Sequence, residues 1–353
     1  MVVAADAPRA KPASGQELSY GAAAAAVAVG REGVIARLIG AATVTAPLVD
    51  HFRAAGAAYD YFWEERWVRD EGYGKIIPTV AKAALADAGI EIGDVAHFVM
   101  PSLLRGAADA AAKRLGFTGK VATALDDGVG YAGAAHALLM LANVLEQAAP
   151  GERILLIGFG QGADALVLEA TDAIVGDRAG RGVTGTVADG LPTDSYLRML
   201  SFHDGIELEW GMRSEKSGKT ALTEQYRSSH QIDGFVAGRC GSCETVQFPQ
   251  YQFCVNCHAP ADGFVDSPLR DAPAKVLTAT ADWLTYHPAP PLYVGFIQFE
   301  NGARVLMEIV DVGPAGIEAG AEVRMVYRIK EKDRQRGYNR YFWKATPVAA
   351  QGE

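Results

Sequence analysis

Cys240-Gly-Ser-Cys243 and, after ten intervening residues, Cys254-Val-Asn-Cys257 contain all four cysteines of this 353-residue chain. Two Cys-x-x-Cys pairs at such a spacing are typical of a site in which four thiolates bind one metal ion. We expect structural zinc, with iron as the alternative metal. Two disulfide bonds are disfavoured, because the sequence carries no secretory signal. With all four thiolates on a metal, no cysteine of this sequence is left to act as a nucleophile.

The composition is that of a globular protein, with 49% hydrophobic and 21% charged residues. The length allows two or three domains, and no apolar stretch is long enough to cross a bilayer. The net charge of −9 disfavours non-specific nucleic-acid binding, which depends mainly on neutralising phosphates. Reduced thiols that hold a metal, without an export signal, predict a cytoplasmic protein.

Helical and strand-like patterns alternate through the first half and predict an α/β layered structure. We expect helices over 76–88, 103–115 and 131–147, and strands over 95–100, 121–125 and 153–159. Ser102 is the expected N-cap of the second helix. The alanine-rich run Gly21–Val29 has high helix propensity, yet its small side chains also suit a buried strand between closely packed helices.

After Gly263 the hydrophobic period changes to two, which predicts strands. The alternating runs cover 275–285, 291–300, 303–312, 321–330 and 338–348. Asn301-Gly302 predicts a hairpin with a type I′ turn, in which both central residues have positive φ. Five short strands of this kind fit a Greek-key barrel such as the OB-fold. A basic stretch is expected in a solvated loop: Arg328, Lys330, Lys332, Arg334 and Arg336.

Several segments of the second half carry a family resemblance: Arg239–Cys243, Gln247-Phe248-Pro249, Cys254–Cys257, Val310-Asp311-Val312 and the approach segment 220–227. They resemble the zinc-ribbon and OB-fold proteins that accompany thiolases and HMG-CoA synthases. The resemblance covers about residues 195 to 349 and implies a rubredoxin-like zinc ribbon followed by an all-β OB-fold barrel.

Segments of the first half carry a second resemblance: Val2–Asp6, Lys11–Ser14, Glu17–Gly30, Tyr61–Asp70 and Pro150–Asp164. They are similar to part of an HMG-CoA synthase or thiolase-type condensing enzyme, and this implies that Ala22–Val29 is a buried strand. The resemblance also implies that the opening strands and helices of that fold are missing, which would expose a sheet edge and apolar helix faces. We therefore expect a tight partner, in a hetero- or homo-oligomer: a chain carrying the opening portion, a thiolase-like subunit, or a portion of the same enzyme encoded upstream.

The family's catalytic groups are not matched. In the family, a cysteine carries the acyl group while a histidine and an asparagine assist the thioester chemistry. Met1 aligns just after the segment that would hold the cysteine, Val99 stands at the histidine position and Val129 at the asparagine position. Because a valine side chain neither transfers a proton nor forms a hydrogen bond, the resemblance implies a degenerate active site.

Three other residues are candidates for catalysis. His97 lies two residues before Val99 and so on the same face of a strand, while Asp126 and Asp127 can form an acid–base pair. Each also has a structural explanation, since aspartates commonly cap helices and His136, among alanines, is expected as a packed core histidine. The candidates for binding acyl-CoA, which also suit a solvated surface and a tight turn, are Arg105, Gly158, Gly160 and Gly162.

The expected organisation has four parts: a thiolase-like α/β segment (1–172), a linker and helical approach segment (173–232), a zinc ribbon (233–265) and an OB-fold barrel (266–353). The first hypothesis is an accessory subunit of an acyl-CoA condensing or cleaving complex, of Claisen or aldol type, whose barrel docks a partner and shapes the acyl-CoA channel.

Two alternatives remain open. The chain could be a complete acyl-CoA lyase or transferase that uses residues such as His97, so whether it is itself an enzyme is undecided at this point. It could also be a single-stranded nucleic-acid-binding module, which needs exposed aromatics in a basic groove. The candidate stripe for that module is Tyr338, Arg340, Tyr341, Phe342, Trp343 and Lys344.

Overall fold

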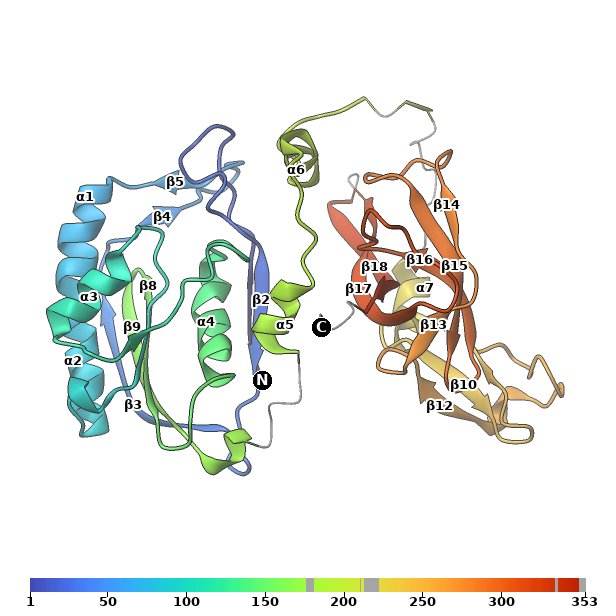
Figure 1. Ribbon diagram of the computed structural model, residues 1–353, viewed down its shortest axis with the longest axis horizontal. Helices are drawn as coiled ribbons and strands as arrows, with labels where there is room; N and C mark the ends of the chain where they lie inside the picture. The colour runs from blue at the N-terminus through green and yellow to red at the C-terminus, as the bar shows by residue number, and fades with distance from the viewer. Residues whose placement is uncertain (176–180, 210, 213–221, 334–335, 349–353) are drawn as a thin grey trace. The chain divides into compact units, whose positions relative to one another are not determined.

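A computed structural model of the chain describes residues 1–175, 181–209, 211–212, 222–333 and 336–348 (Figure 1). The chain divides into two compact units, Met1–Gly190 and Leu191–Glu353, each with its own buried hydrophobic residues. Parts of the expected linker (173–232) and barrel (266–353) lie outside the described residues, as do Arg334 of the basic stretch and positions 220–221 of the approach segment. The four-part division stays a prediction.

A five-stranded mixed sheet forms the centre of the first unit. Its order is β3 (Ala36–Thr45), β9 (Gly162–Ala170), β8 (Arg153–Gly160), β6 (His97–Val99) and β7 (Lys120–Val121). Strands β6, β7 and β8 run parallel, whereas β9 pairs antiparallel with both β8 and β3. The sheet is covered on both faces, which explains the nearly continuous apolar run in β8.

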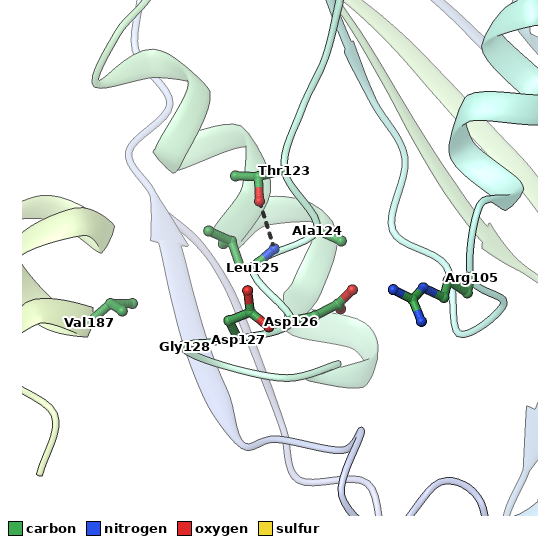
Figure 2. Close-up of a pocket in the computed structure, with 8 residues that line it drawn as sticks. All are labelled: Arg105, Thr123, Ala124, Leu125, Asp126, Asp127, Gly128 and Val187. Atoms are coloured by element: carbon green, nitrogen blue, oxygen red, sulfur yellow. Dashed lines mark hydrogen bonds between the residues drawn. The ribbon is translucent and has the colours of Figure 1, made fainter. Parts of the chain in front are cut away.

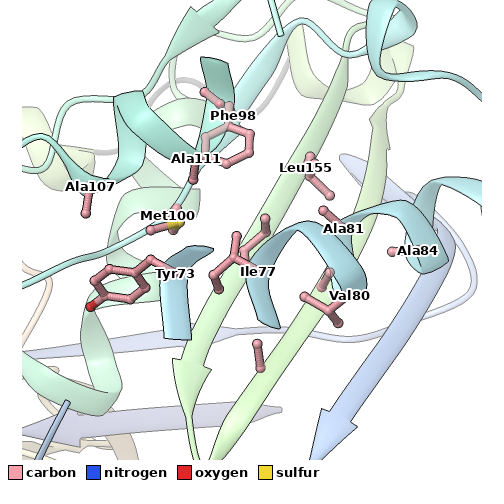
Figure 3. Packing of buried hydrophobic residues seen from close by; sticks show 14 of the residues in the cluster. Tyr73, Ile77, Val80, Ala81, Ala84, Phe98, Met100, Ala107, Ala111 and Leu155 are labelled. Atoms are coloured by element: carbon pink, nitrogen blue, oxygen red, sulfur yellow. The ribbon is translucent and has the colours of Figure 1, made fainter. Parts of the chain in front are cut away.

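Helices cover the two faces of this sheet (Figure 1). The π-helix η1 (Val68–Ile76), α2 (Ile77–Ala88) and α3 (Ala107–Leu115) lie on one face, after the short α1 (Glu65–Trp67). Figure 3 shows their apolar side chains against the sheet: Tyr73, Ile77, Val80 and Ala111 with Phe98 and Leu155. Alternate residues of β8 point to the opposite face, where they pack on α4 (His136–Leu145).

The alanine-rich run is a strand, as the resemblance implied. β2 (Ala23–Val27) pairs antiparallel with β1 (Val2–Asp6), and the pair lies beyond α4 (Figure 1). The expectation of burial was wrong, because Ala24 and Ala26 are exposed and only the alternate residues are half-buried. Within the described residues β2 belongs to a two-stranded sheet, so only the face toward α4 is covered.

Helix ends and strand lengths in the first unit depart from expectation at three places. The helix expected over 131–147 is α4, which begins only at His136, after a 3-10 turn, and ends at Leu145. Helix α3 begins at Ala107, after Gly106 in the left-handed region (φ 72°), and Ser102 instead makes hydrogen bonds with the backbone of Leu104. Strand β7 ends at Val121, because the chain then turns through Leu125, which has φ 61°.

The short elements of the first unit complete its outline. They are β4 (His51–Phe52), β5 (Tyr61–Phe62), the 3-10 turns η2 (Ile92–Asp94), η3 (Gly133–Ala135) and η4 (Asp172–Val175), and α5 (Gly182–Ala188). Among the residues that the structure describes, no helix has the length and apolar character needed to span a bilayer.

Among its described residues, the second unit begins with the short helices α6 (Tyr196–Phe202), α7 (Leu222–Arg227) and α8 (Ser229–Ile232). A three-stranded sheet follows, in the order β11 (Val246–Gln247), β10 (Val236–Cys240) and β12 (Phe264–Pro268). Phe235, just before β10, packs against rings of the barrel, with its centroid 6.0 Å from Trp343 and 5.9 Å from Phe299. The ribbon and the barrel therefore share one core.

The barrel closes as an OB-fold does. Its strands are β13 (Ala274–Val276), β14 (Thr280–Asp282), β15 (Leu292–Phe299), β16 (Arg304–Ile309), β17 (Glu322–Asp333) and β18 (Tyr338–Pro347). The order β13-β17-β18-β16-β15 returns to β13, which pairs with both β17 and β15. The third and fifth long strands, β16 and β18, pair in parallel. The predicted five-stranded OB barrel is confirmed.

Details of the barrel correct three expectations. Only Gly302 has positive φ (91°) in the Asn301-Gly302 hairpin, and the Gly302 N–H bonds to the Phe299 carbonyl, so the turn is not type I′. The run 275–285 is two strands rather than one. The basic stretch was expected in a loop, but up to Asp333 its residues belong to β17, which pairs antiparallel with β18.

Candidate functional site

The four cysteines form one cluster in the ribbon. Their sulfur atoms lie within 4.8 Å of one another, with 3.6 Å between Cys240 and Cys257 and 3.6 Å between Cys243 and Cys254. A tetrahedral zinc site with Zn–S bonds of about 2.3 Å has sulfur–sulfur separations of roughly 3.8 Å. The arrangement fits such a centre, as the sequence predicted.

Backbone amides support the sulfur atoms. The N–H of Ser242 donates to Cys240 Sγ at 3.4 Å, and the N–H of Asn256 donates to Cys254 Sγ at 3.4 Å. Hydrogen bonding with the Thr245 side chain lowers the pKa of the Cys243 thiol to about 5. Because four thiolates at this separation repel one another strongly, a bound cation is needed to hold all four ionised.

A pocket of about 390 Å³ lies in the first unit (Figure 2). We call it the acidic pocket; its lining residues are Arg105, Thr123, Ala124, Leu125, Asp126, Asp127, Gly128 and Val187. Arg105 follows β6 and the segment 123–128 follows β7, so the pocket lies beyond the carboxyl ends of parallel strands. Ligands of α/β folds are commonly bound at this edge.

His136 of α4 and Glu146, the C-cap of that helix, hold the walls of the acidic pocket. His136 is fully buried; its Nε2 donates to the Ala124 carbonyl at 2.8 Å and its Nδ1 accepts from the Ala132 N–H at 3.1 Å. Burial lowers the pKa of His136, which keeps the ring neutral and suited to these two roles. Glu146 accepts from the N–H and hydroxyl of Thr184 and so fixes the helix that carries Val187.

The structure brings together three of the expected site residues and separates the others. Arg105, Asp126 and Asp127 line the acidic pocket, and Figure 2 shows both carboxylates between Val187 and Arg105. His97 is 7% exposed and its Nε2 lies 2.8 Å from Glu152 Oε2. Because Glu152 precedes β8, this pair lies at the amino ends of the parallel strands.

The three glycines expected near acyl-CoA lie at the β8–β9 hairpin. A methyl group at Gly158 or Gly160 would have open space around it. At Gly162, which has φ 101°, it would come within 1.9 Å of the Val44 carbonyl in β3. Gly162 therefore permits close backbone packing, and none of the three lines the acidic pocket.

Sequence reasoning missed a buried acid–base cluster. Asp50 is 4% exposed; its Oδ1 lies 2.6 Å from His51 Nδ1, and its Oδ2 accepts from the Tyr73 hydroxyl at 3.0 Å. The Tyr131 ring contacts His51 edge-on at 5.8 Å. Burial lowers the pKa of His51, but the hydrogen bond to Asp50 and the negative charges of Asp50, Asp60 and Asp6 together outweigh burial and raise the pKa. The dipeptide Asp50-His51 was the available signal, but its burial depends on distant η1.

Most side chains of the candidate nucleic-acid-binding stripe already contact other residues of the protein. Phe342 packs against the barrel core, and Trp343 Nε1 donates to the Asp233 carbonyl at 2.9 Å. Nearby basic side chains pair with acids: Arg340 with Glu331, Lys344 with Glu308, Arg328 with Asp311 and Lys332 with Asp204. These pairings reduce the positive charge available to a phosphate backbone.

Comparison with known proteins links each half to a different group. A family model described as 3-oxoacyl-[acyl-carrier-protein (ACP)] synthase III C terminal matches residues 85–169. The hydroxymethylglutaryl-CoA synthase of Pyrobaculum neutrophilum is 33% identical over 184 residues, 49% of this chain and 50% of that protein. A DUF35 domain-containing scaffold protein of Methanocaldococcus jannaschii is 31% identical over 120 residues, 32% of this chain and 81% of that protein.

Two solved structures are each similar to a part of the chain. The structure described as Ltp2-ChsH2(DUF35) aldolase shares 19% identity over 38% of this chain and 98% of that chain, with a TM-score of 0.28. A 3-oxoacyl-[acyl-carrier-protein] synthase III from Aquifex aeolicus shares 16% identity over 39% of this chain and 46% of that chain, with a TM-score of 0.35. The chain spans about half the length of the curated hydroxymethylglutaryl-CoA synthases it matches. Both resemblances expected from the sequence are confirmed.

Proposed function

Because the chain belongs to the DUF35 domain-containing proteins and joins their ribbon and barrel to a thiolase-like unit, we propose that it is an accessory subunit of an acyl-CoA condensing or cleaving complex. The reaction class is Claisen or aldol chemistry, by similarity to hydroxymethylglutaryl-CoA synthases. The observation that carries the proposal is the gathering of all four cysteines in one cluster, which leaves no thiol of this sequence for acyl transfer. A partner chain supplies the nucleophile.

The metal in the ribbon is zinc in this proposal. Cys240, Cys243, Cys254 and Cys257 would hold it, and the ion would cross-link the two turns that carry these residues. Its role is structural, because four protein thiolates leave no open position for a substrate. The shared core of ribbon and barrel would then give the barrel a fixed surface for a partner.

The acidic pocket is the proposed contact with acyl-CoA. Arg105 supplies a cation for a CoA phosphate, while Asp126 and Asp127 supply carboxylates beside the acyl end. Arg105→Ala is expected to weaken acyl-CoA binding about tenfold, as measured by calorimetry on the complex. Lys113→Ala, an exposed cation of α3 outside the pocket, is the matched control and is expected to leave the affinity unchanged.

Co-purification tests the accessory role. The full chain is expressed with cysteine-bearing thiolase-like chains encoded near it, and the mixture is incubated with an acyl-CoA and examined by mass spectrometry. We expect a stable complex in which only the partner gains the acyl group. A lone monomer, or acylation of any of the four cysteines of this chain, would contradict the proposal.

A second candidate function is acid–base catalysis on an acyl-CoA by this chain. It is favoured by the Asp50–His51 pair, in which a buried carboxylate orients a histidine, and it also keeps His97, Asp126 and Asp127 as candidate groups. His51→Gln is expected to lower turnover at least a hundredfold. The control is His230→Gln, which removes an exposed histidine 2.7 Å from Asp266. An inactive wild-type chain, or an unaffected His51 variant, excludes this candidate.

A further inference from the structure

A second pocket of the first unit is built mainly from aromatic rings. It has a volume of about 290 Å³ and is lined by Tyr61, Trp63, Glu64 and Trp67; we call it the aromatic pocket. Tyr61 begins β5 and Trp67 ends α1, two elements that are neighbours in Figure 1. Tyr61 and Trp67 are 62% and 58% exposed, a large apolar exposure that marks binding surfaces.

Two of the three rings pack against other residues of the first unit. Trp63 packs against the buried core, and its backbone N–H donates to the Asp50 carbonyl at 2.9 Å. The Tyr61 ring packs on Phe52, with 5.6 Å between centroids. Among the ring contacts made by the described residues, none joins two of the three pocket rings. Part of each ring is therefore accessible, and the rings of Tyr61 and Trp67 are the most exposed.

Glu64 supplies a carboxylate that its own helix does not use. Its neighbours form ion pairs four residues apart: Glu65 with Arg69, Arg66 with Asp70, and Glu71 with Lys75. The residue four positions after Glu64 is the buried Val68, which offers no charge. Glu64 is the N-cap of α1 but makes no side-chain cap hydrogen bond, and the described part of the chain gives its carboxylate no ion-pair partner.

We propose that the aromatic pocket binds an organic cation, with the guanidinium group of an arginine side chain from a partner protein as the best fit. A cation over the face of a tryptophan or tyrosine is attracted by the ring quadrupole. A guanidinium group stacks on such faces and also donates two parallel hydrogen bonds to one carboxylate. A neutral ligand would cover Glu64 without pairing it, and an anion would be repelled. The site does not depend on the accessory role proposed above.

Calorimetry and tryptophan fluorescence test the site on the full, metal-loaded chain. The probes are N-acetylarginine amide, tetramethylammonium and sodium, each as the chloride at one ionic strength. We expect saturable binding of the arginine derivative with a Kd on the order of 1 mM, as befits one side chain. Glu64→Gln and Trp67→Ala are each expected to weaken it about fivefold or more.

Two control variants separate the pocket from its surroundings. Glu65→Gln removes the adjacent carboxylate, which is already paired with Arg69, and Trp283→Ala removes an exposed tryptophan of the second unit. Both are expected to bind like wild type. Tighter binding of tetramethylammonium than of the arginine derivative would overturn the guanidinium assignment. A response to sodium of the same size, no saturation, or equal loss in the control variants would overturn the site.

Discussion

Gly128 lies where the wall of the acidic pocket meets α5. A methyl group added at this position would come within 2.4 Å of Val187 Cγ1. His136 of α4 holds the pocket segment, and Glu146, the C-cap of α4, holds α5. At the scale of single residues, the acidic pocket thus depends on the close approach of Gly128 to Val187 and on two polar side chains, His136 and Glu146, that are buried or half-buried. Each of these can be changed separately.

Gly128→Ala is expected to push α5 away and to lower the free energy of unfolding of the first unit by about 1 kcal/mol. Adding Val187→Ala removes the obstructing methyl groups and should recover most of that loss. Chemical denaturation of the two single variants and the double variant measures the coupling. Additive effects would show that the two residues do not meet.

The pH dependence of stability should contain two opposite contributions. Burial holds the pKa of His136 below its ordinary 6.5, so the unfolded chain binds more protons. The stabilisation of the folded state by neutral His136 is therefore complete above pH 6.5 and is lost as the pH falls through the pKa of His136 in the folded chain. The pKa of His51 is raised by Asp50 despite burial, so its contribution is complete below the unfolded pKa and is lost as the pH rises through the folded value.

Urea unfolding at about pH 5.5 and about pH 8 distinguishes the contributions of the two histidines to the free energy of unfolding. His136→Gln should lose less stability than wild type on acidification, and His51→Gln should lose less on going to the alkaline side. Parallel pH profiles for wild type and both variants would mean that neither histidine changes its proton affinity on folding.

Among the elements, the first strand of the barrel is interrupted where it crosses β15. Between β13 and β14, the Thr278 carbonyl passes so close to Gly295 that an added methyl group would lie 1.9 Å from it. The first half of this strand, β13, can therefore pair with both β17 and β15, and its second half, β14, continues the pairing with β15. Closure of the barrel depends on this contact.

Gly295→Ala is expected to destabilise the second unit by roughly 3 kcal/mol, because backbone atoms cannot move aside as a side chain does. Gly263→Ala is the matched control, since nothing lies within 4 Å of a methyl group there, and it should change stability by less than about 0.5 kcal/mol. Chemical denaturation, followed by the tryptophan fluorescence of the chain, measures both. Equal midpoints for the two variants would refute the role of Gly295.

The whole molecule contains separate hydrophobic cores in its two units, and the cysteine cluster belongs to the unit Leu191–Glu353. Calorimetry should therefore record two thermal transitions. A strong zinc chelator should lower one of them and leave the other in place, because metal binding adds only to the stability of the unit that contains the ligands. A single transition that shifts as a whole would contradict this division.

Several features could be predicted because their signals are local in the chain. The spacing of Cys240, Cys243, Cys254 and Cys257 predicted the cluster, since each pair sits in one tight turn. Alternation with period two predicted the long barrel strands. The resemblances predicted the strand character of Ala23–Val27, although propensity favours a helix there.

Other features depend on contacts between segments far apart in sequence. Arg105 shares a pocket with Asp126, Asp127 and Val187 only because β6 pairs with β7 and α5 packs on α4. Asp50 becomes a buried acceptor only beneath Tyr73 of η1. The burial of β2 was mispredicted for the same reason, since covering a strand face requires a neighbour that the strand's own residues do not specify. Local pattern determines which element forms, whereas burial, charge pairing and pocket shape follow from which elements meet.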